Sequence, residues 1–182
     1  PLFFDADGDG DLDLYVVSGG VEWAEGHEFL KDRLLMNDGK GGFSNGPDGV
    51  LPDLRDSGGV VTAADFDRDG DVDLFVGGRV VPWKYPSTPN SRLLVNDGGK
   101  FSDRTDELAP GLRQTGMATG ALWSDADGDG WIDLFITHEW GPIKIWRNHA
   151  GNFVETTKEA GLAEHLGWWN SIAGGDLDND GD

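Results

Sequence analysis

The stretch Asp5-Ala-Asp-Gly-Asp-Gly-Asp-Leu-Asp13 decides the fold, because the chain contains this acidic loop four times. Complete copies follow at residues 65–73 and 125–133, and a shortened fourth copy occupies residues 176–182. Carboxylates at alternate positions, with Gly at position six, can fold around one hard cation such as Ca2+, which takes several oxygen ligands. A solvated acidic run is the alternative interpretation. Recurrence at a fixed internal spacing favours the cation loop.

The loop begins like an EF-hand but departs from one at its twelfth position. An EF-hand needs a bidentate Glu there and a helix on either side. Here the twelfth residues are Val16, Val76 and Ile136, which lie in short β-branched and aromatic runs typical of strands. The sequence therefore predicts a loop between two strands, with its last side-chain ligand at position nine.

The copies also indicate how the ligands are divided along the loop. Positions one, three, five and nine are Asp in all three complete copies, and we assign them as side-chain ligands. Position seven is Asp11, Asp71 and then Trp131. Because an indole cannot ligate Ca2+, this position is expected to supply its backbone carbonyl. The predicted Ca2+ ligands, in three complete sites and a truncated fourth, are Asp5, Asp7, Asp9, Asp11, Asp13, Asp65, Asp67, Asp69, Asp71, Asp73, Asp125, Asp127, Asp129, Trp131, Asp133, Asp176, Asp178, Asp180 and Asp182.

The charge of the chain is concentrated in these loops. Acidic residues number 34 against 14 basic ones, for a formal net charge of −20, and 18 of the acidic residues are loop aspartates. Bound cations would neutralise much of this local excess, whereas the metal-free clusters repel themselves. No basic stripe is available for phosphates, so nucleic acid is excluded as a predicted partner.

Other global features bear on where the protein works. Cysteine is absent, so neither a disulfide framework nor a Cys metal site is expected. No stretch approaches the roughly 20 apolar residues of a membrane span. Loops of this kind fill readily at the millimolar Ca2+ found outside cells. We expect an extracellular or cell-surface location, with the periplasm as an alternative, a bacterial source, and a chain that is one piece of a longer protein.

The loops begin at residues 5, 65, 125 and 176, and this period is typical of stacked supersecondary units such as propeller blades. Each unit has a small-residue strand before the loop, a second strand after it, a third strand ending in Asn, and a Gly-rich turn leading to a fourth strand. The predicted first strands are 60–64, 119–124 and 171–175; the second are 14–17, 74–76 and 134–136; the third are 33–37, 92–96 and 144–148; the fourth surround Phe43, Phe101 and Phe153. A turn or short helix is expected at 156–166.

Four antiparallel strands per repeat form the unit of a β-propeller. The predicted fold is an all-β propeller region spanning residues 1–182, with about three blades that form a fragment or part of a larger ring. The predicted blades are 1–58, 59–116 and 117–167, with 168–182 as the truncated start of a fourth. The missing part of the ring would come from the rest of the protein or from another copy.

Antiparallel order places the acidic loops and the Gly-rich turns at one end of the blades. The variable connections at the other end are predicted at 18–32, 45–58, 78–91, 104–116, 137–142 and 155–167. Exposed aromatic side chains are expected there, at Trp23, Phe29, Trp83, Tyr85, Trp140, Trp168 and Trp169. Such loops on rigid scaffolds commonly carry function. Packing between blades is the alternative role for each Trp, and Trp123 and Trp146 are expected in the core.

The chain resembles the FG-GAP/VCBS repeat family, and within it the cartilage-acidic-protein and UnbV-like group. The D-x-D-x-D-G-x-x-D-L loops carry the resemblance, together with the R-L-L-x-N-D-G hairpins at 33–43 and 92–101 and the E-T-T-K-E-A-G segment at 155–161. No literal Phe-Gly…Gly-Ala-Pro occurs, so the integrin-like subtype is the weaker match. The resemblance implies an extracellular propeller in which Ca2+ is structural, and it implies no single ligand.

Two classes of function follow. The first is a non-catalytic adhesion or interaction module that binds protein or glycan on the face opposite the acidic loops; a structural unit of a larger surface assembly is a separate alternative to it. The second is a polysaccharide lyase or hydrolase, for which His27, His138, Glu139 and Tyr85 are the acid/base candidates. None of these four recurs between repeats, and no nucleophile motif accompanies them. The sequence therefore favours the non-catalytic module.

Overall fold

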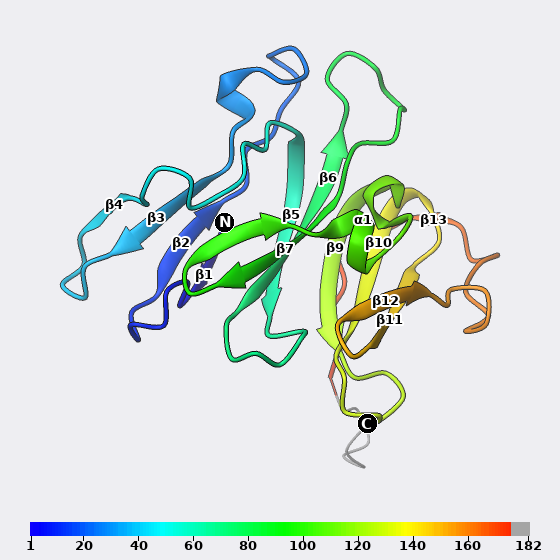
Figure 1. Cartoon of the computed structure of the whole chain (residues 1–182). Helices are drawn as coiled ribbons and strands as arrows, with labels where there is room; N and C mark the ends of the chain where they lie inside the picture. Colours follow the sequence, from blue (N-terminus) through cyan, green and yellow to red (C-terminus); the bar gives the residue numbers. More distant parts are fainter. Residues whose placement is uncertain (176–182) are drawn as a thin grey trace.

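A computed structural model describes residues 1–175, in which three antiparallel sheets stand side by side (Figure 1). The first sheet contains β1 (Leu2–Phe4), β2 (Asp13–Val16), β3 (Arg33–Asn37) and β4 (Phe43–Asn45). The second contains β5 (Ser57–Ala64), β6 (Asp73–Val80), β7 (Arg92–Asp97) and β8 (Lys100–Asp103). The third contains β9 (Met117–Ser124), β10 (Asp133–Gly141), β11 (Lys144–His149) and β12 (Asn152–Glu155).

In each sheet the four strands lie in chain order, every neighbour antiparallel. This confirms the predicted all-β class and the four-stranded repeat unit, while the three sheets form an open row rather than a closed ring. The third sheet gains a fifth strand, β13 (Gly167–Trp168), which pairs with the far end of β10. No helix in residues 1–175 has the length and apolar character of a membrane span.

Two of the three second strands run further than the sequence predicts. β6 continues through Val80 and β10 through Gly141, into segments predicted as variable connections. Gly77 lies just beyond the predicted strand 74–76 but within β6, where an added Cβ would clash with Val60 of β5 and stand 2.7 Å from the Cβ of Ala118. Glycine is present here because two sheets approach each other closely, not because the chain turns.

One further expectation is wrong in detail. Residues 171–175 were predicted as a strand, but none is assigned there. Residues 156–166, expected as a turn or short helix, contain turns; the short helices are η1 (Glu28–Leu30), α1 (Thr105–Leu108) and η2 (Leu112–Gln114). The helix α1, with sequence T-D-E-L, begins two residues after Asp103. Asp103 Oδ1 accepts hydrogen bonds from the backbone N–H and from the hydroxyl of Thr105. These two bonds satisfy donors at the start of the helical turn.

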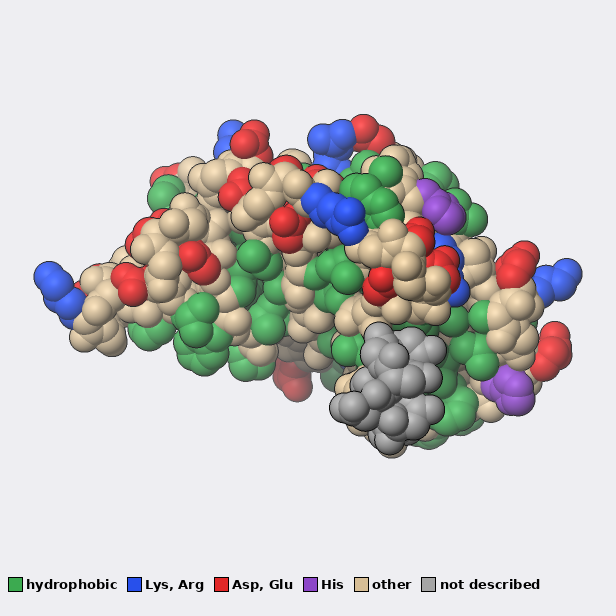
Figure 2. Space-filling view, turned by 90° about the horizontal axis from the view of Figure 1, so that it is seen from below, with side chains coloured by type: hydrophobic (Ala, Val, Ile, Leu, Met, Phe, Trp, Pro, Cys, Tyr) green, Lys and Arg blue, Asp and Glu red, His purple; other side chains and the backbone are tan. Residues whose placement is uncertain are grey.

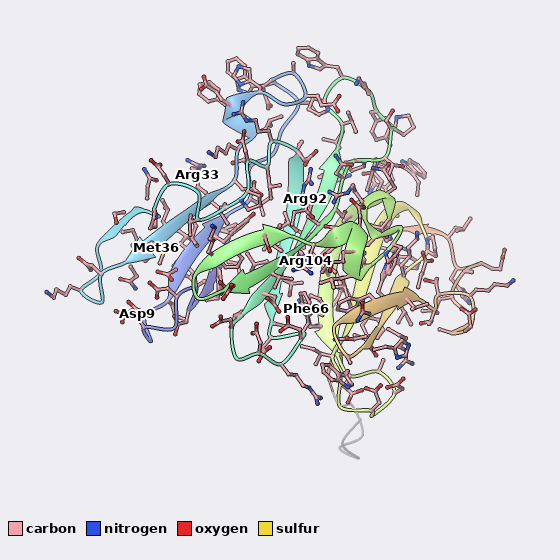
Figure 3. All side chains as sticks on the ribbon, in the orientation of Figure 1. Asp9, Arg33, Met36, Phe66, Arg92 and Arg104 are labelled. Atoms are coloured by element: carbon pink, nitrogen blue, oxygen red, sulfur yellow. The ribbon has the colours of Figure 1, made fainter. Side chains whose placement is uncertain are left out.

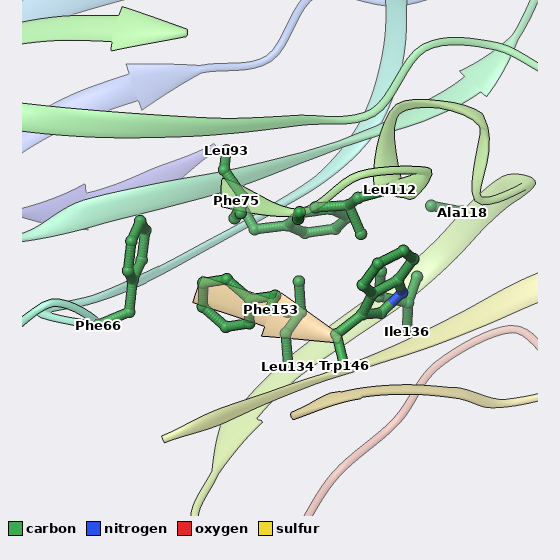
Figure 4. Packing of buried hydrophobic residues seen from close by; sticks show 10 residues of the cluster. Phe66, Phe75, Leu93, Leu112, Ala118, Leu134, Ile136, Trp146 and Phe153 are labelled. Atoms are coloured by element: carbon green, nitrogen blue, oxygen red, sulfur yellow. The ribbon is translucent and has the colours of Figure 1, made fainter. Parts of the chain in front are cut away.

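The core lies between the sheets. One cluster of buried side chains joins the first sheet to the second, and includes Phe4, Tyr15, Leu74 and Phe101. The other joins the second sheet to the third. Its aromatic members Phe66 and Phe153 meet edge to face with ring centroids 5.3 Å apart, and Trp146 is buried beside them as predicted (Figure 4). Face-to-face packing of neighbouring sheets is the arrangement of propeller blades.

Candidate functional site

The three complete acidic loops share one end of the molecule. Each joins the first and second strands of its sheet, as predicted, and Asp9 lies at this end in Figure 3. Seen from that end, acidic side chains are spread over all three sheets with hydrophobic side chains between them (Figure 2). The turn at position six follows the expected geometry, because Gly10, Gly70 and Gly130 have φ of +90°, +101° and +90°. A side chain would be strained there.

In each complete loop, carboxylate oxygens of positions one, three and nine lie within 4.8 Å of one another. The three groups are Asp5, Asp7 and Asp13; Asp65, Asp67 and Asp73; and Asp125, Asp127 and Asp133. Oxygens on opposite sides of a Ca2+ ion are about 5 Å apart, so each group can share one cation. The predicted ligands of the fourth copy, Asp176, Asp178, Asp180 and Asp182, lie outside the described residues.

The structure does not bring the carboxylates of positions five and seven into these groups. At position five, Asp9 Oδ1 instead accepts a hydrogen bond of 2.9 Å from the backbone N–H of Asp11. At position seven, Asp71 Oδ2 accepts one of 2.7 Å from the N–H of Gly98, in the turn between β7 and β8. These contacts shape the loop and fasten it to the neighbouring turn.

The aspartate at position nine is buried and holds its own sheet together. In the second sheet, Asp73 Oδ2 accepts from the N–H of Phe66 and Asp73 Oδ1 from the N–H of Asn96, at 3.3 and 2.9 Å. The equivalent pairs of bonds are made by Asp13 to Ala6 and Asn37, and by Asp133 to Ala126 and Asn148. Position nine thus fixes the loop between two strands and still faces the carboxylate group.

Burial sets the electrostatics of the loops. Desolvation raises the pKa of Asp73 to about 7, and the charges of Asp67 and Asp69 add to the effect. Desolvation likewise raises the pKa values of Asp7, Asp67 and Asp133 above their usual 3.8. A cation in each group would supply the missing positive charge and favour the ionised form.

One atom offers a test of whether a cation fits. Asp65 Oδ1 is buried, and no hydrogen-bond partner for it exists among the described residues. In the other two loops the matching Oδ1 atoms, of Asp5 and Asp125, accept from the N–H at position four. A buried carboxylate oxygen without a donor is costly, whereas a metal–oxygen bond would satisfy it. The residues present therefore fit a hard cation.

The opposite end of the sheets carries a cleft of about 560 Å³ at the junction of the second and third sheets. Exposed rings of Tyr85 and Trp140 line it. Glu139 is buried at its side, where it accepts a hydrogen bond of 2.8 Å from the Tyr85 hydroxyl and pairs with Arg79. Trp140 Nε1 donates to the Tyr85 oxygen, and its ring packs against Trp168 with centroids 4.9 Å apart.

The side chains predicted as acid/base candidates are engaged in the fold. His138 is buried; its Nδ1 lies 3.1 Å from the Pro142 carbonyl and its Nε2 lies 3.3 Å from the Thr115 hydroxyl. Desolvation lowers the pKa of His138 to about 4, so the ring is neutral at physiological pH. His27 stacks on Trp23, and its Nδ1 accepts from the Phe29 N–H. Sequence reasoning missed this burial because His138 and Glu139 were placed in a loop rather than in β10.

A family model described as "FG-GAP-like repeat" matches residues 5–76 and 125–182. This chain belongs to the FG-GAP-like repeat family. Cartilage acidic protein 1 of Mus musculus is 33% identical over 98 residues, which cover 50% of this chain and 15% of that protein. The Homo sapiens protein of the same name is 32% identical over 98 residues, and the Xenopus tropicalis one 30% over 97, each covering 50% of this chain and 14% of its own. The aligned part of this chain thus spans only a small fraction of the length of these relatives.

Proposed function

We propose that this FG-GAP-like chain is a calcium-stabilised, non-catalytic module that binds a protein or glycan partner outside the cell. The observation that carries the proposal is the threefold recurrence of one carboxylate group, at positions one, three and nine, between the strands of each sheet. Ca2+ is the cation we assign, because all predicted ligands are oxygens and millimolar extracellular Ca2+ suits loops of this type. The backbone carbonyls of Asp11, Asp71 and Trp131 would complete the sites.

In this proposal the cation is structural. It would neutralise carboxylates that otherwise repel one another, and would fix the loop that links the first two strands of each sheet. Residues of the chain hold the loop in place: the Asp at position nine fixes it between two strands, and the Asp at position five shapes its turn. A cation bound at the loops would then stabilise the whole sheet array.

Removal of Ca2+ tests this role. A site with a Kd near 10 µM would stabilise the fold by about 2.7 kcal/mol at 1 mM Ca2+. We expect the unfolding midpoint of the chain in 1 mM Ca2+ to exceed clearly that in EDTA, with Mg2+ at the same concentration giving a smaller gain. Equal midpoints with and without Ca2+ would show that the cations are incidental.

We assign the surface that binds the partner to the end of the sheets opposite the acidic loops. Two features support it: the cleft beside Glu139, and exposed aromatic rings, with Trp83, Tyr85 and Trp140 between 55% and 73% exposed. Aromatic rings stack on sugar faces and also dominate protein contact sites. The geometry favours binding over catalysis, because both nitrogens of His138 and the carboxylate of Glu139 already have partners within the fold.

Binding is tested by screening the Ca2+-loaded chain on oligosaccharide arrays and against extracellular matrix proteins. Trp140→Ala is expected to weaken any captured interaction at least tenfold, as truncation of an aromatic anchor commonly does. Val154→Ser provides the control, because Val154 is exposed on β12 and does not line the cleft. Turnover of a polysaccharide that is lost in His138→Ala, with the fold intact, would favour the enzyme instead.

A further inference from the structure

The third acidic loop differs from the first two in the residue that precedes the repeated Asn of the third strand. That residue is Met36 in β3 and Val95 in β7, but Arg147 in β11. Each of these residues directly precedes the Asn whose backbone N–H binds the position-nine aspartate. One loop out of three is therefore flanked by a guanidinium where the others have an apolar side chain.

The guanidinium of Arg147 reaches into the carboxylate group itself. Its Nη1 lies 2.5 Å from Asp127 Oδ2 and 3.1 Å from Asp133 Oδ2, which are positions three and nine of the loop. The Arg147 side chain is only 21% exposed, so the pair is partly shielded from water. Among residues 1–175, no Lys or Arg pairs with a carboxylate of the first or second loop.

A second guanidinium fastens the same loop from the neighbouring sheet. Arg68 occupies position four of the second loop and lies over the ring of Trp131, with its Cζ 4.1 Å from the ring centroid. It also donates to the Gly130 carbonyl. The other loops have Gly8 and Gly128 at position four, and Arg68 adopts the same positive φ, at 65°. A non-Gly residue in that region is strained, so the contact with the third loop has to offset a backbone cost.

We propose that Arg147 is a built-in counter-ion of the third loop, so that this loop binds Ca2+ more weakly than the first two and holds its shape without it. The proposal rests on the calcium function proposed above. The third loop has four aspartates against five in each of the others, and Arg147 adds a positive charge between two of its cluster carboxylates. A cation that enters the third loop must displace the Arg147 guanidinium or bind against its repulsion. Either effect lowers the affinity of this loop for Ca2+.

The test uses the full 182-residue chain, freed of metal and titrated with CaCl2 by calorimetry. We expect two tight sites and one weaker site. Arg147→Met, which installs the residue found at the equivalent position of β3, should raise the affinity of the weak site by about tenfold or more. Arg147→Lys keeps the positive charge and should leave the weak site weak. The reciprocal change, Met36→Arg, should weaken one of the two tight sites.

Trp131 allows the third loop to be observed alone. Tb3+ replaces Ca2+ in oxygen sites, and its emission is sensitised by an adjacent indole. The part of the Tb3+ emission that disappears in Trp131→Phe comes from the third loop. In Arg147→Met, this part of the emission should saturate at a lower Tb3+ concentration than in the unmodified chain. In the absence of metal, Arg147→Met should also unfold at a lower temperature, because Asp127 and Asp133 lose their counter-charge.

Three sites of equal affinity that stay equal in Arg147→Met would overturn the counter-ion role while leaving the calcium function intact. Binding to none of the three loops would overturn both proposals. If Arg147→Met fails to fold, Met36→Arg decides, since an unchanged affinity of the first loop in that variant contradicts the proposal.

Discussion

At the scale of single residues, the buried aspartate at position nine meets two demands at once. Asp73 accepts two backbone hydrogen bonds that hold its loop between strands, and it also lies within 4.8 Å of two other carboxylates. Burial without a cation favours the protonated form, whereas the hydrogen bonds favour the ionised one. The raised pKa of about 7 shows that desolvation dominates in the metal-free protein.

This balance gives a pH dependence whose sign can be worked out. The pKa of Asp73 is about 7 when folded and 3.8 when unfolded, so between these values the folded state binds more protons. The free energy of unfolding of the metal-free protein should therefore fall as pH rises, by about 1 kcal/mol between pH 6.5 and 8. His138 acts in the opposite direction, because burial lowers its pKa to about 4 while the unfolded imidazole is still half protonated at pH 6.5. Over the same interval it offsets about 0.4 kcal/mol of the Asp73 effect, so that a smaller net fall is expected.

Urea unfolding of the metal-free chain at pH 6.5, 7.2 and 8 measures this effect. Saturating Ca2+ should flatten or reverse the trend, because the cation binds the ionised carboxylate. A metal-free protein whose stability increases over this range would contradict the assignment of a raised pKa to Asp73.

The division of ligands within the loop gives a second prediction at this scale. Trp131→Ala keeps the backbone carbonyl that we assign to position seven, although it removes the ring beneath Arg68. Asp129→Ala removes a carboxylate whose Oδ1 also accepts a hydrogen bond of 2.8 Å from the Trp131 N–H. Asp129→Ala should therefore lose more Ca2+ affinity in the third loop than Trp131→Ala. Calorimetric titration of both variants is the measurement, and equal losses would count against the carbonyl assignment.

At the scale of elements, the repeated Asn at the end of each third strand joins one sheet to the next. Asn148 Nδ2 donates to the carbonyl of Phe66, in the second loop, at 2.8 Å, and to that of Ile132, in its own loop, at 3.1 Å. Asn96 makes the matching bonds to Ala6 and Val72. One side chain thus ties two acidic loops together, so that the sheets and the candidate cation sites form one connected layer.

The first sheet supplies a matched control for this clamp. Asn37 Nδ2 bonds only to Leu12, in its own loop, because no described sheet precedes the first. Asn148→Ala should therefore cost about 1–2 kcal/mol more than Asn37→Ala, since it leaves the buried Phe66 carbonyl without a partner. Denaturant unfolding of the two variants in the same Ca2+ concentration checks this. Equal costs would show that the bond between sheets contributes little.

The elements also show how far the sequence alone predicts this protein. The third strands follow from short runs such as R-L-L-V-N, bounded by Asn-Asp-Gly turns, and the structure places them as expected. The second strands β6 and β10 were predicted too short, because Gly77 and the polar pair His138-Glu139 resemble loop residues. Both cases depend on contacts between sheets and on partners in β9, which no local pattern encodes. The spacing predicted side-chain ligands at positions one, three, five and nine, and the structure groups only one, three and nine, because position five bonds to the backbone of its own loop. The role of Arg147 required knowing which strand packs beside the loop.

At the scale of the whole molecule, the open row of sheets formed by residues 1–175 presents an apolar face at each end. On the first sheet, Phe4 is buried toward the second sheet, so its neighbour Phe3 points outward and is 57% exposed. Its ring meets that of Phe43 with centroids 6.2 Å apart. At the other end, Leu122 and Phe135 line a hollow together with Ile172. Apolar faces of terminal repeats are normally capped or covered.

Exposure of both faces predicts that the isolated 182-residue chain associates with itself. We expect sedimentation velocity to show a concentration-dependent shift from monomer to larger species in Ca2+, because burying the end faces removes apolar surface from water. The double variant Phe3→Ser and Phe43→Ser should reduce this association, since it makes one of the two faces polar. Val21→Ser is the control: Val21 is also exposed, but it lies in the loop after β2, at the opposite end from the acidic loops. A Ca2+-loaded chain that remains a folded monomer across the concentration range would contradict this prediction. It would show that three sheets joined by the Asn side chains and by cations are stable without a covering partner, unlike most repeat arrays.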